Sequence, residues 1–106
     1  MKKHELSIGL NDAESKVQEL STDETMRIIS AVCFDQAGGA TIIPNCTGIY
    51  THDDGTKIIE NTIRCEFYGQ ERETVIRIAK ILCKALNQES IALSETEIYS
   101  DFIQAE

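Results

Sequence analysis

The sequence predicts an α+β domain: a four-stranded antiparallel sheet with two helices on one face, built in the order β-α-β-β-α-β. Two segments carry apolar residues at helical spacing, the segments around them alternate apolar and polar residues, and an Asp-Gly pair separates the two central alternating segments. The chain has 106 residues, of which 42% are hydrophobic and 26% charged. This is enough for one hydrophobic core, so we expect a single domain over residues 1–106.

The first strand is predicted over residues 4–10 (HELSIGL), because apolar and polar residues alternate there. The face that this alternation assigns to the core carries His4, Leu6, Ile8 and Leu10. Residues 11–20 are polar and predict a loop. A helix is then expected over residues 22–36. Ser21 and Glu24 form an S-x-x-E capping box at its start, and Gly38 and Gly39 end it.

The central hairpin is predicted over residues 40–68. Residues 40–51 are rich in β-branched side chains, and Pro44 marks a strand start, a bulge or an edge position because it cannot donate to a ladder. Asp54-Gly55 makes the turn. In the return strand, one face carries Ile59, Ile63, Cys65 and Phe67, and the other carries Ile58, Glu60, Thr62, Arg64, Glu66 and Tyr68.

The second helix is predicted over residues 70–87, and the last strand over residues 89–93 (ESIAL). The helix has an apolar stripe of Val75, Ile78, Ala79, Leu82, Cys83 and Leu86. Residues 94–106 either continue the strand past a bulge, pair at an edge or dock as a separate short element. Right-handed crossovers put both helices on the same side of the sheet, which is the ferredoxin-like arrangement. The other face has no helix and would carry Glu5, Ser7, Thr62, Arg64 and Glu66.

The charge balance bears on the partners. The formal net charge is −8, which argues against generic nucleic-acid binding and favours basic partners. An acidic surface that occupies the basic groove of another protein fits this charge better. No apolar run approaches the roughly 20 residues needed to cross a bilayer, so no membrane partner is expected. The basic start lacks an apolar signal core, and we expect a cytoplasmic protein.

Several patterns suggest chemistry without establishing it. His52, Asp53 and Asp54 are adjacent potential ligands, but their side chains diverge and Asp favours turns, so a hairpin tip is favoured over a metal site. The four cysteines are 13, 19 and 18 residues apart with no close pair, which indicates buried thiols. Neither His4 nor His52 is placed to activate a thiol. No metal or cofactor is expected.

The outward row of the return strand is the most charged feature of the sheet. Arg64 between Glu60 and Glu66 would keep both carboxylates ionised, which is the opposite of what a general acid needs near neutral pH. An ion-pair ladder or a binding surface is therefore favoured over catalysis.

Three segments carry a resemblance to a known family: "IGL" at the end of the first strand, "GIY...DDGTKIIENTIRCEF" in the hairpin and "NQESI" before the last strand. In these the chain resembles a family of small uncharacterised bacterial ferredoxin-like domains. Many members of that family are secreted, whereas this sequence shows no leader. The resemblance implies no activity. It draws attention to Gly48, Tyr50, Gly55, Glu60, Gln88, Glu89 and Ser90.

The function predicted from these observations is that of a non-enzymatic acidic binding protein, which captures a protein or small ligand stoichiometrically. Its most specific form is a phage- or mobile-element-encoded inhibitor of bacterial defence. The alternatives are a small enzyme with an active site between subunits and a small-molecule-sensing module. A homo-oligomer is expected, because a sheet face without helices must be hydrated or buried. The candidate binding residues are Tyr50, Glu60, Thr62, Arg64, Glu66, Gln88 and Glu89.

Overall fold

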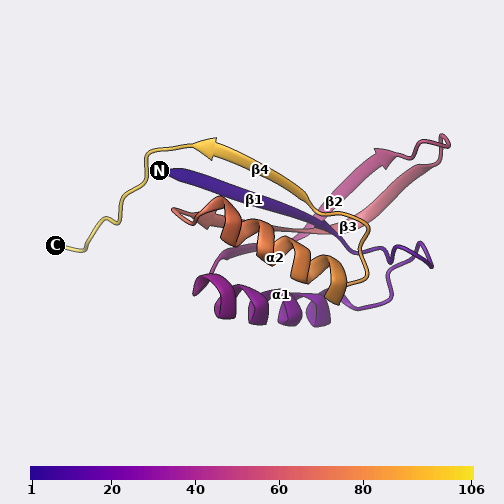
Figure 1. Cartoon of the computed structure of the whole chain (residues 1–106), viewed down its shortest axis with the longest axis horizontal. Coiled ribbons are helices and arrows are strands. Elements are labelled where there is room, and N and C mark those ends of the chain that lie inside the picture. The colour runs from indigo at the N-terminus through magenta and orange to yellow at the C-terminus, as the bar shows by residue number, and fades with distance from the viewer.

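The protein consists of one antiparallel sheet with two helices packed on one side of it (Figure 1). This computed structural model describes all residues, 1–106. The elements are β1 (Lys2–Gly9), α1 (Thr22–Ala37), β2 (Thr41–Thr51), β3 (Lys57–Tyr68), α2 (Arg72–Ala85) and β4 (Ala92–Glu97). The strand order is β2-β3-β1-β4. The predicted ferredoxin-like fold is confirmed.

The core lies between the sheet and the helices. Leu6 and Ile8 of β1 and Phe67 of β3 are fully or almost fully buried, and Ile78 and Leu82 of α2 pack over them. His4 is also buried, as its place in the alternation predicts. The opposite face of the sheet is covered by neither helix, so its side chains are available to form a site.

Helix α1 begins and ends where the sequence indicates. The Ser21 side chain accepts a hydrogen bond from the Glu24 N–H at 3.1 Å, which satisfies one of the free donors of the first turn. Gly38 stops the helix in the left-handed conformation, with φ of 78°, and its N–H donates to the Phe34 carbonyl.

The β2–β3 hairpin projects beyond the helices as an arm (Figure 1). Pro44 lies at a bulge, where the register shifts between Ile43 and Cys46, and β2 is also an edge strand. Because no helix reaches this arm, Ile59 is 74% exposed although it shares the parity of the core residues. The face that Ile59 shares with Ile63, Cys65 and Phe67 is therefore buried only from Ile63 onward.

The last strand starts later than the sequence predicts. Ala92 pairs with Ser7, and the pairing runs to Lys2 opposite Glu97, so β4 lies at the sheet edge beside β1. Residues 89–91 precede the strand, since residues 87 and 88 bond to the loop after β1. Residues 98–106 leave the sheet without regular structure and extend away from the end of the molecule opposite the hairpin arm (Figure 1).

Neither helix has the length and apolar character that crossing a membrane would require.

Candidate functional site

A groove of about 550 Å³ opens on the helix-free face, at the end where β1 stops. Four parts of the chain enclose it: the end of β1, the β2–β3 arm, the loop at residues 11–16 and the loop at residues 88–90. Five of the seven predicted binding residues line it, namely Tyr50, Glu60, Thr62, Gln88 and Glu89. The sheet brings together residues that are nearly 40 positions apart in the chain.

The Glu60 carboxylate lies at the base of this groove. Its Oε2 accepts a hydrogen bond from the Asn11 N–H at 2.9 Å. A Cβ at position 9 would lie 2.8 Å from Glu60 Oε2 and closer still to Oε1. Glycine at this position therefore lets the carboxylate of β3 lie across the end of β1.

A second glycine opens the groove on the other side of Glu60. Gly48 pairs with Glu60 in the β2–β3 register, and a Cβ there would lie 2.6 Å from Thr62 Oγ1. The absence of a side chain at Gly48 exposes the Thr62 hydroxyl and the stem of Glu60. The sequence pattern marked Gly48 only through the family resemblance, and it gave no reason for a glycine at position 9.

Tyr50 forms the aromatic wall. Burial and the nearby Glu60 carboxylate raise the pKa of the Tyr50 phenol, so it stays protonated near neutral pH and can donate a hydrogen bond. The Tyr50 ring meets the His52 ring edge to face, with centroids 5.3 Å apart. His52 therefore belongs to the groove as well as to the hairpin end, which the turn interpretation missed.

Another part of the groove lining is built by two loops bonded to each other. The Gln88 side-chain amide donates to the Asn11 carbonyl at 2.7 Å, and the Asn87 side chain donates to Asp12 Oδ1 at 2.9 Å. The Ala13 N–H donates to the Asn87 carbonyl at 2.9 Å. Sequence alone offers no signal for such pairing, since these residues lie in polar loops more than 70 positions apart.

Glu89 lies at the mouth of the groove rather than at its base. Its carboxylate is mostly exposed and lies 4.0 Å from Lys16 Nζ. This pair places one charge of each sign where a ligand would enter.

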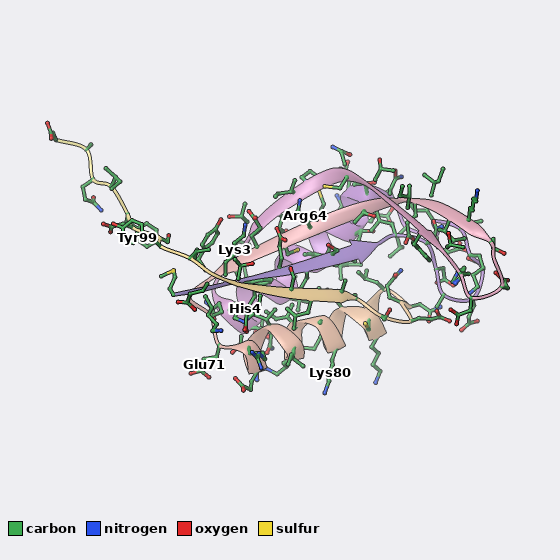
Figure 2. All side chains as sticks on the ribbon, turned by 90° about the horizontal axis from the view of Figure 1, so that it is seen from above. Lys3, His4, Arg64, Glu71, Lys80 and Tyr99 are labelled. Carbon is green, nitrogen blue, oxygen red and sulfur yellow. The ribbon has the colours of Figure 1, made fainter.

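Two of the predicted binding residues, Arg64 and Glu66, lie outside the groove. Arg64 pairs with Glu5 of β1, and Lys3 Nζ lies 2.6 Å from a Glu66 oxygen. The hydrogen bond and charge of Lys3 lower the pKa of the Glu66 carboxyl. The ladder is thus real but runs across β1 and β3, and the expected pairing of Arg64 with Glu60 was wrong. Figure 2 views the sheet from the side opposite the helices, with Lys3 and Arg64 labelled over the strands.

A second charged cluster lies at the other end of the sheet. Glu95 of β4 accepts two hydrogen bonds from Arg72, at 3.0 and 2.8 Å, one from Lys2 at 3.0 Å, and lies 2.8 Å from His4 Nε2. Arg72, Lys2 and His4 together hold the pKa of Glu95 well below its usual range. This cluster ties β4 to β1 and α2, and we assign it to stability.

The cysteines and the hairpin end offer no assembled metal site, since no three His, Cys, Asp or Glu side chains gather in a suitable arrangement. All four cysteines are free; Cys33 and Cys65 are buried, whereas Cys46 and Cys83 are half-buried. At the hairpin end, Asp54 Oδ1 accepts from the Thr56 N–H at 2.9 Å and Gly55 has φ of 88°. These are the contacts of a turn.

Comparisons with known proteins concern the fold. Searches with the sequence found no matching protein-family model and no matching curated protein. Among solved structures, a phage SAM lyase in complex with S-methyl-5'-thioadenosine is similar with a TM-score of 0.70 and 20% identity, over 91% of this chain and 80% of that chain. A phage SAM lyase in the apo state is similar with a TM-score of 0.56 and 17% identity, over 99% and 91%. The divalent cation tolerance protein CutA1 from Thermus thermophilus is similar with a TM-score of 0.60 and 16% identity, over 96% and 88%.

Proposed function

We propose that the groove binds S-adenosylmethionine (SAM) or a closely related nucleoside sulfonium compound and cleaves it. The observation that carries this proposal is the convergence of Tyr50, Glu60 and Gln88 on one groove of the helix-free face. The likeness of the fold to a phage SAM lyase in complex with S-methyl-5'-thioadenosine supports the choice of ligand.

The groove has the size and chemistry for such a ligand. Its volume of about 550 Å³ falls within the roughly 300–1,000 Å³ typical of small-molecule sites. The Tyr50 and His52 rings offer an aromatic wall to an adenine base. Glu60 at the base and Glu89 at the mouth offer negative charge to a ligand with a sulfonium and an ammonium group.

The proposed reaction needs no proton transfer. The carboxylate of SAM attacks its own Cγ, the Cγ–S bond breaks, and the electron pair of that bond stays on sulfur. The products are neutral methylthioadenosine and homoserine lactone, which keeps the ammonium charge. The carboxylate and sulfonium charges cancel as the transition state forms, so a site that excludes water accelerates the step by destabilising the separated charges.

This charge change decides the role of Glu60. A carboxylate beside the sulfonium would stabilise the substrate more than the transition state, because the sulfonium charge disappears during the reaction. The ammonium keeps its charge throughout. We therefore assign Glu60 to the ligand's ammonium group, where its stabilisation is not lost in the transition state. Tyr50, which stays protonated, donates a hydrogen bond to the ligand.

The test is incubation of the purified protein with SAM, followed by mass spectrometry of both products. We expect methylthioadenosine and homoserine lactone in equal amounts and in excess over the protein. Glu60→Gln removes the charge at the base of the groove and should lower kcat/KM at least about tenfold. Glu66→Gln is the matched control, since Glu66 lies on the same face outside the groove. No product from the wild-type protein, or equal losses in the two variants, would refute the proposal.

We further propose that the protein forms a homo-oligomer through the hairpin arm and the tail. Ile49 and Ile59 pair across the arm and are each 74% exposed. At the other end, Tyr99, Phe102 and Ile103 are 86–88% exposed. A tail that packs on the arm of a neighbouring copy would cover both apolar surfaces, and such a head-to-tail contact forms a ring when the rotation between copies closes. Ile49 also lines the groove, so the neighbour would border the site.

Light scattering after size-exclusion chromatography tests this assembly. The wild-type protein should exceed the 11.8 kDa of one chain, and deletion of residues 99–106 or the change Ile59→Asp should each give the monomer. A monomeric wild-type protein at high concentration would refute the assembly, and so would an assembly unchanged by both variants.

A second candidate function is stoichiometric capture of a basic protein, and the net charge of −8 favours it. In both cases the protein would act as a phage- or mobile-element-encoded inhibitor of bacterial defence, by removing SAM or by occupying a partner. The SAM assay separates the two. Turnover supports the lyase, whereas binding of a basic partner without SAM turnover supports capture.

A further inference from the structure

We propose that Gln88 is a positioning residue that holds Glu60 in place through the backbone of Asn11. This inference rests on the proposed function, because it concerns the carboxylate that we assign to the ligand's ammonium group. Gln88 lies on the loop before β4 and Glu60 on the hairpin arm, so neither neighbours the other in the chain.

Two hydrogen bonds link the three residues. The Gln88 side-chain amide donates to the Asn11 carbonyl at 2.7 Å, and the Asn11 N–H donates to Glu60 Oε2 at 2.9 Å. Asn11 is thus held from both sides, by an amide of the last loop and by a carboxylate of β3. Both bonds are partly buried, so water competes with them less than at an exposed surface.

The chain around Asn11 explains why one side chain has this influence. Asn11 follows directly after β1 and Leu10, whose N–H donates to the Asn61 carbonyl at 2.9 Å. Beyond Asn11 the chain turns at Asp12. Without Gln88 the Asn11 carbonyl loses its partner on the loop before β4. Asn11 itself is then held by its bridge to Gln18 and by the bonds of its neighbours Leu10 and Asp12. A shift of about 1 Å suffices to break a hydrogen bond of 2.9 Å.

The position of Glu60 matters because the groove gives the carboxylate freedom on its other sides. Gly9 and Gly48 have no side chain that could restrain it. The bond to Asn11 therefore fixes which way the carboxylate points, and a ligand ammonium meets a preorganised partner only while that bond is intact.

The first measurement is independent of activity. Amide hydrogen exchange of Asn11, followed by NMR, reports its hydrogen bond to Glu60. We expect Gln88→Ala to raise the exchange rate of this amide at least about tenfold. Gln70→Ala is the matched control, because it removes another partly buried bond from a glutamine side-chain amide to a backbone carbonyl, Gln70 to Ala37 at 3.2 Å, away from this link. An unchanged Asn11 amide in Gln88→Ala, or an equal rise in Gln70→Ala, overturns the inference.

The second measurement is a double-mutant cycle between positions 88 and 60, with kcat/KM for SAM as the measured quantity. Gln88→Ala should lower kcat/KM for SAM about tenfold in the wild-type background and less than about twofold in the Glu60→Gln background, because it acts through that carboxylate. Equal effects in both backgrounds overturn the inference. Gln88→Glu, which cannot donate from its charged carboxylate, repeats the test if Gln88→Ala does not fold. A wild-type protein without SAM cleavage refutes the proposed function, while the exchange experiment still decides the link from Gln88 to Asn11.

Discussion

The substitution Gly9→Ala tests whether the Glu60 carboxylate lies where the structure places it. Gly9 does not need the left-handed conformation, so alanine causes no backbone strain there. The added Cβ would overlap the carboxylate. Glu60 must then turn away and lose its hydrogen bond from the Asn11 N–H.

Two opposing effects set the magnitude. Loss of a hydrogen bond to a charged group costs roughly 1.5–3 kcal/mol. Replacing glycine by alanine at a position without strain stabilises by about 0.4–1 kcal/mol, because the unfolded chain loses freedom. The net change in the wild-type background is therefore a destabilisation of about 0.5–2.6 kcal/mol. In a Glu60→Ala background there is no carboxylate to displace, so the same substitution should stabilise by about 0.4–1 kcal/mol.

The assay is urea unfolding of the four proteins of this cycle, followed by circular dichroism. The coupling between positions 9 and 60 should be about 1.5–3 kcal/mol, and the slope of the transition should stay constant. If Gly9→Ala changes the free energy of unfolding equally in both backgrounds, the carboxylate does not lie over the end of β1. The description of the groove would then be wrong.

Three further outcomes are expected from the rest of the fold. Glu95→Gln should remove an acid-sensitive contribution to stability. The folded-state pKa of Glu95 lies below its ordinary value of 4.5, so its contribution to stability is present above that pH and is lost as the pH falls. The difference in the free energy of unfolding between wild type and variant should therefore stay constant from neutral pH to about 5 and shrink below 4.5. A difference independent of pH would contradict this. Ser21→Ala should cost about 1 kcal/mol in urea unfolding, through loss of the bond from the Glu24 N–H; an unchanged midpoint would show that this cap contributes nothing. Leu82→Ala should lower the free energy of unfolding by roughly 2–5 kcal/mol, since Leu82 is fully buried. Ile59→Ala should lower it by less than about 0.5 kcal/mol in the monomeric protein. Similar losses in the two variants would mean that the arm is packed.

The fold followed from the sequence because its signals are local. The cap at Ser21, the stop at Gly38 and the turn at Gly55 each depend on a few neighbouring residues. The error at the last strand has a non-local cause. ESIAL has the composition of a strand, but Gln88 is bonded to Asn11, and pairing with β1 begins only at Ala92.

The site was only partly predictable for the same reason. Alternation correctly placed Glu60 and Arg64 on one face of the sheet. It could not predict which residue of another strand or loop each side chain contacts. β1 supplies Glu5 to Arg64, whereas the loop after β1 supplies the Asn11 N–H to Glu60. Two residues of similar sequence context thus have different roles, one in an ion-pair ladder and one in a groove. Which strand or loop lies beside each residue decides this, and the topology sets it.

The proposed reaction also explains why the lack of an acid–base pair in the sequence is misleading evidence against catalysis. General acid–base catalysis serves reactions in which a proton must move as a bond breaks. Here the leaving group is a neutral thioether and the nucleophile is already an anion within the same molecule. In the proposed reaction, the protein's part would be to hold that molecule in the conformation that brings its carboxylate to Cγ. A glycine at position 9, a carboxylate fixed by a backbone N–H and an aromatic wall suit that task. Tyr50 and Glu60 are candidates from the sequence alone, whereas the glycine at position 9 shows its role only once Glu60 is seen to lie against it.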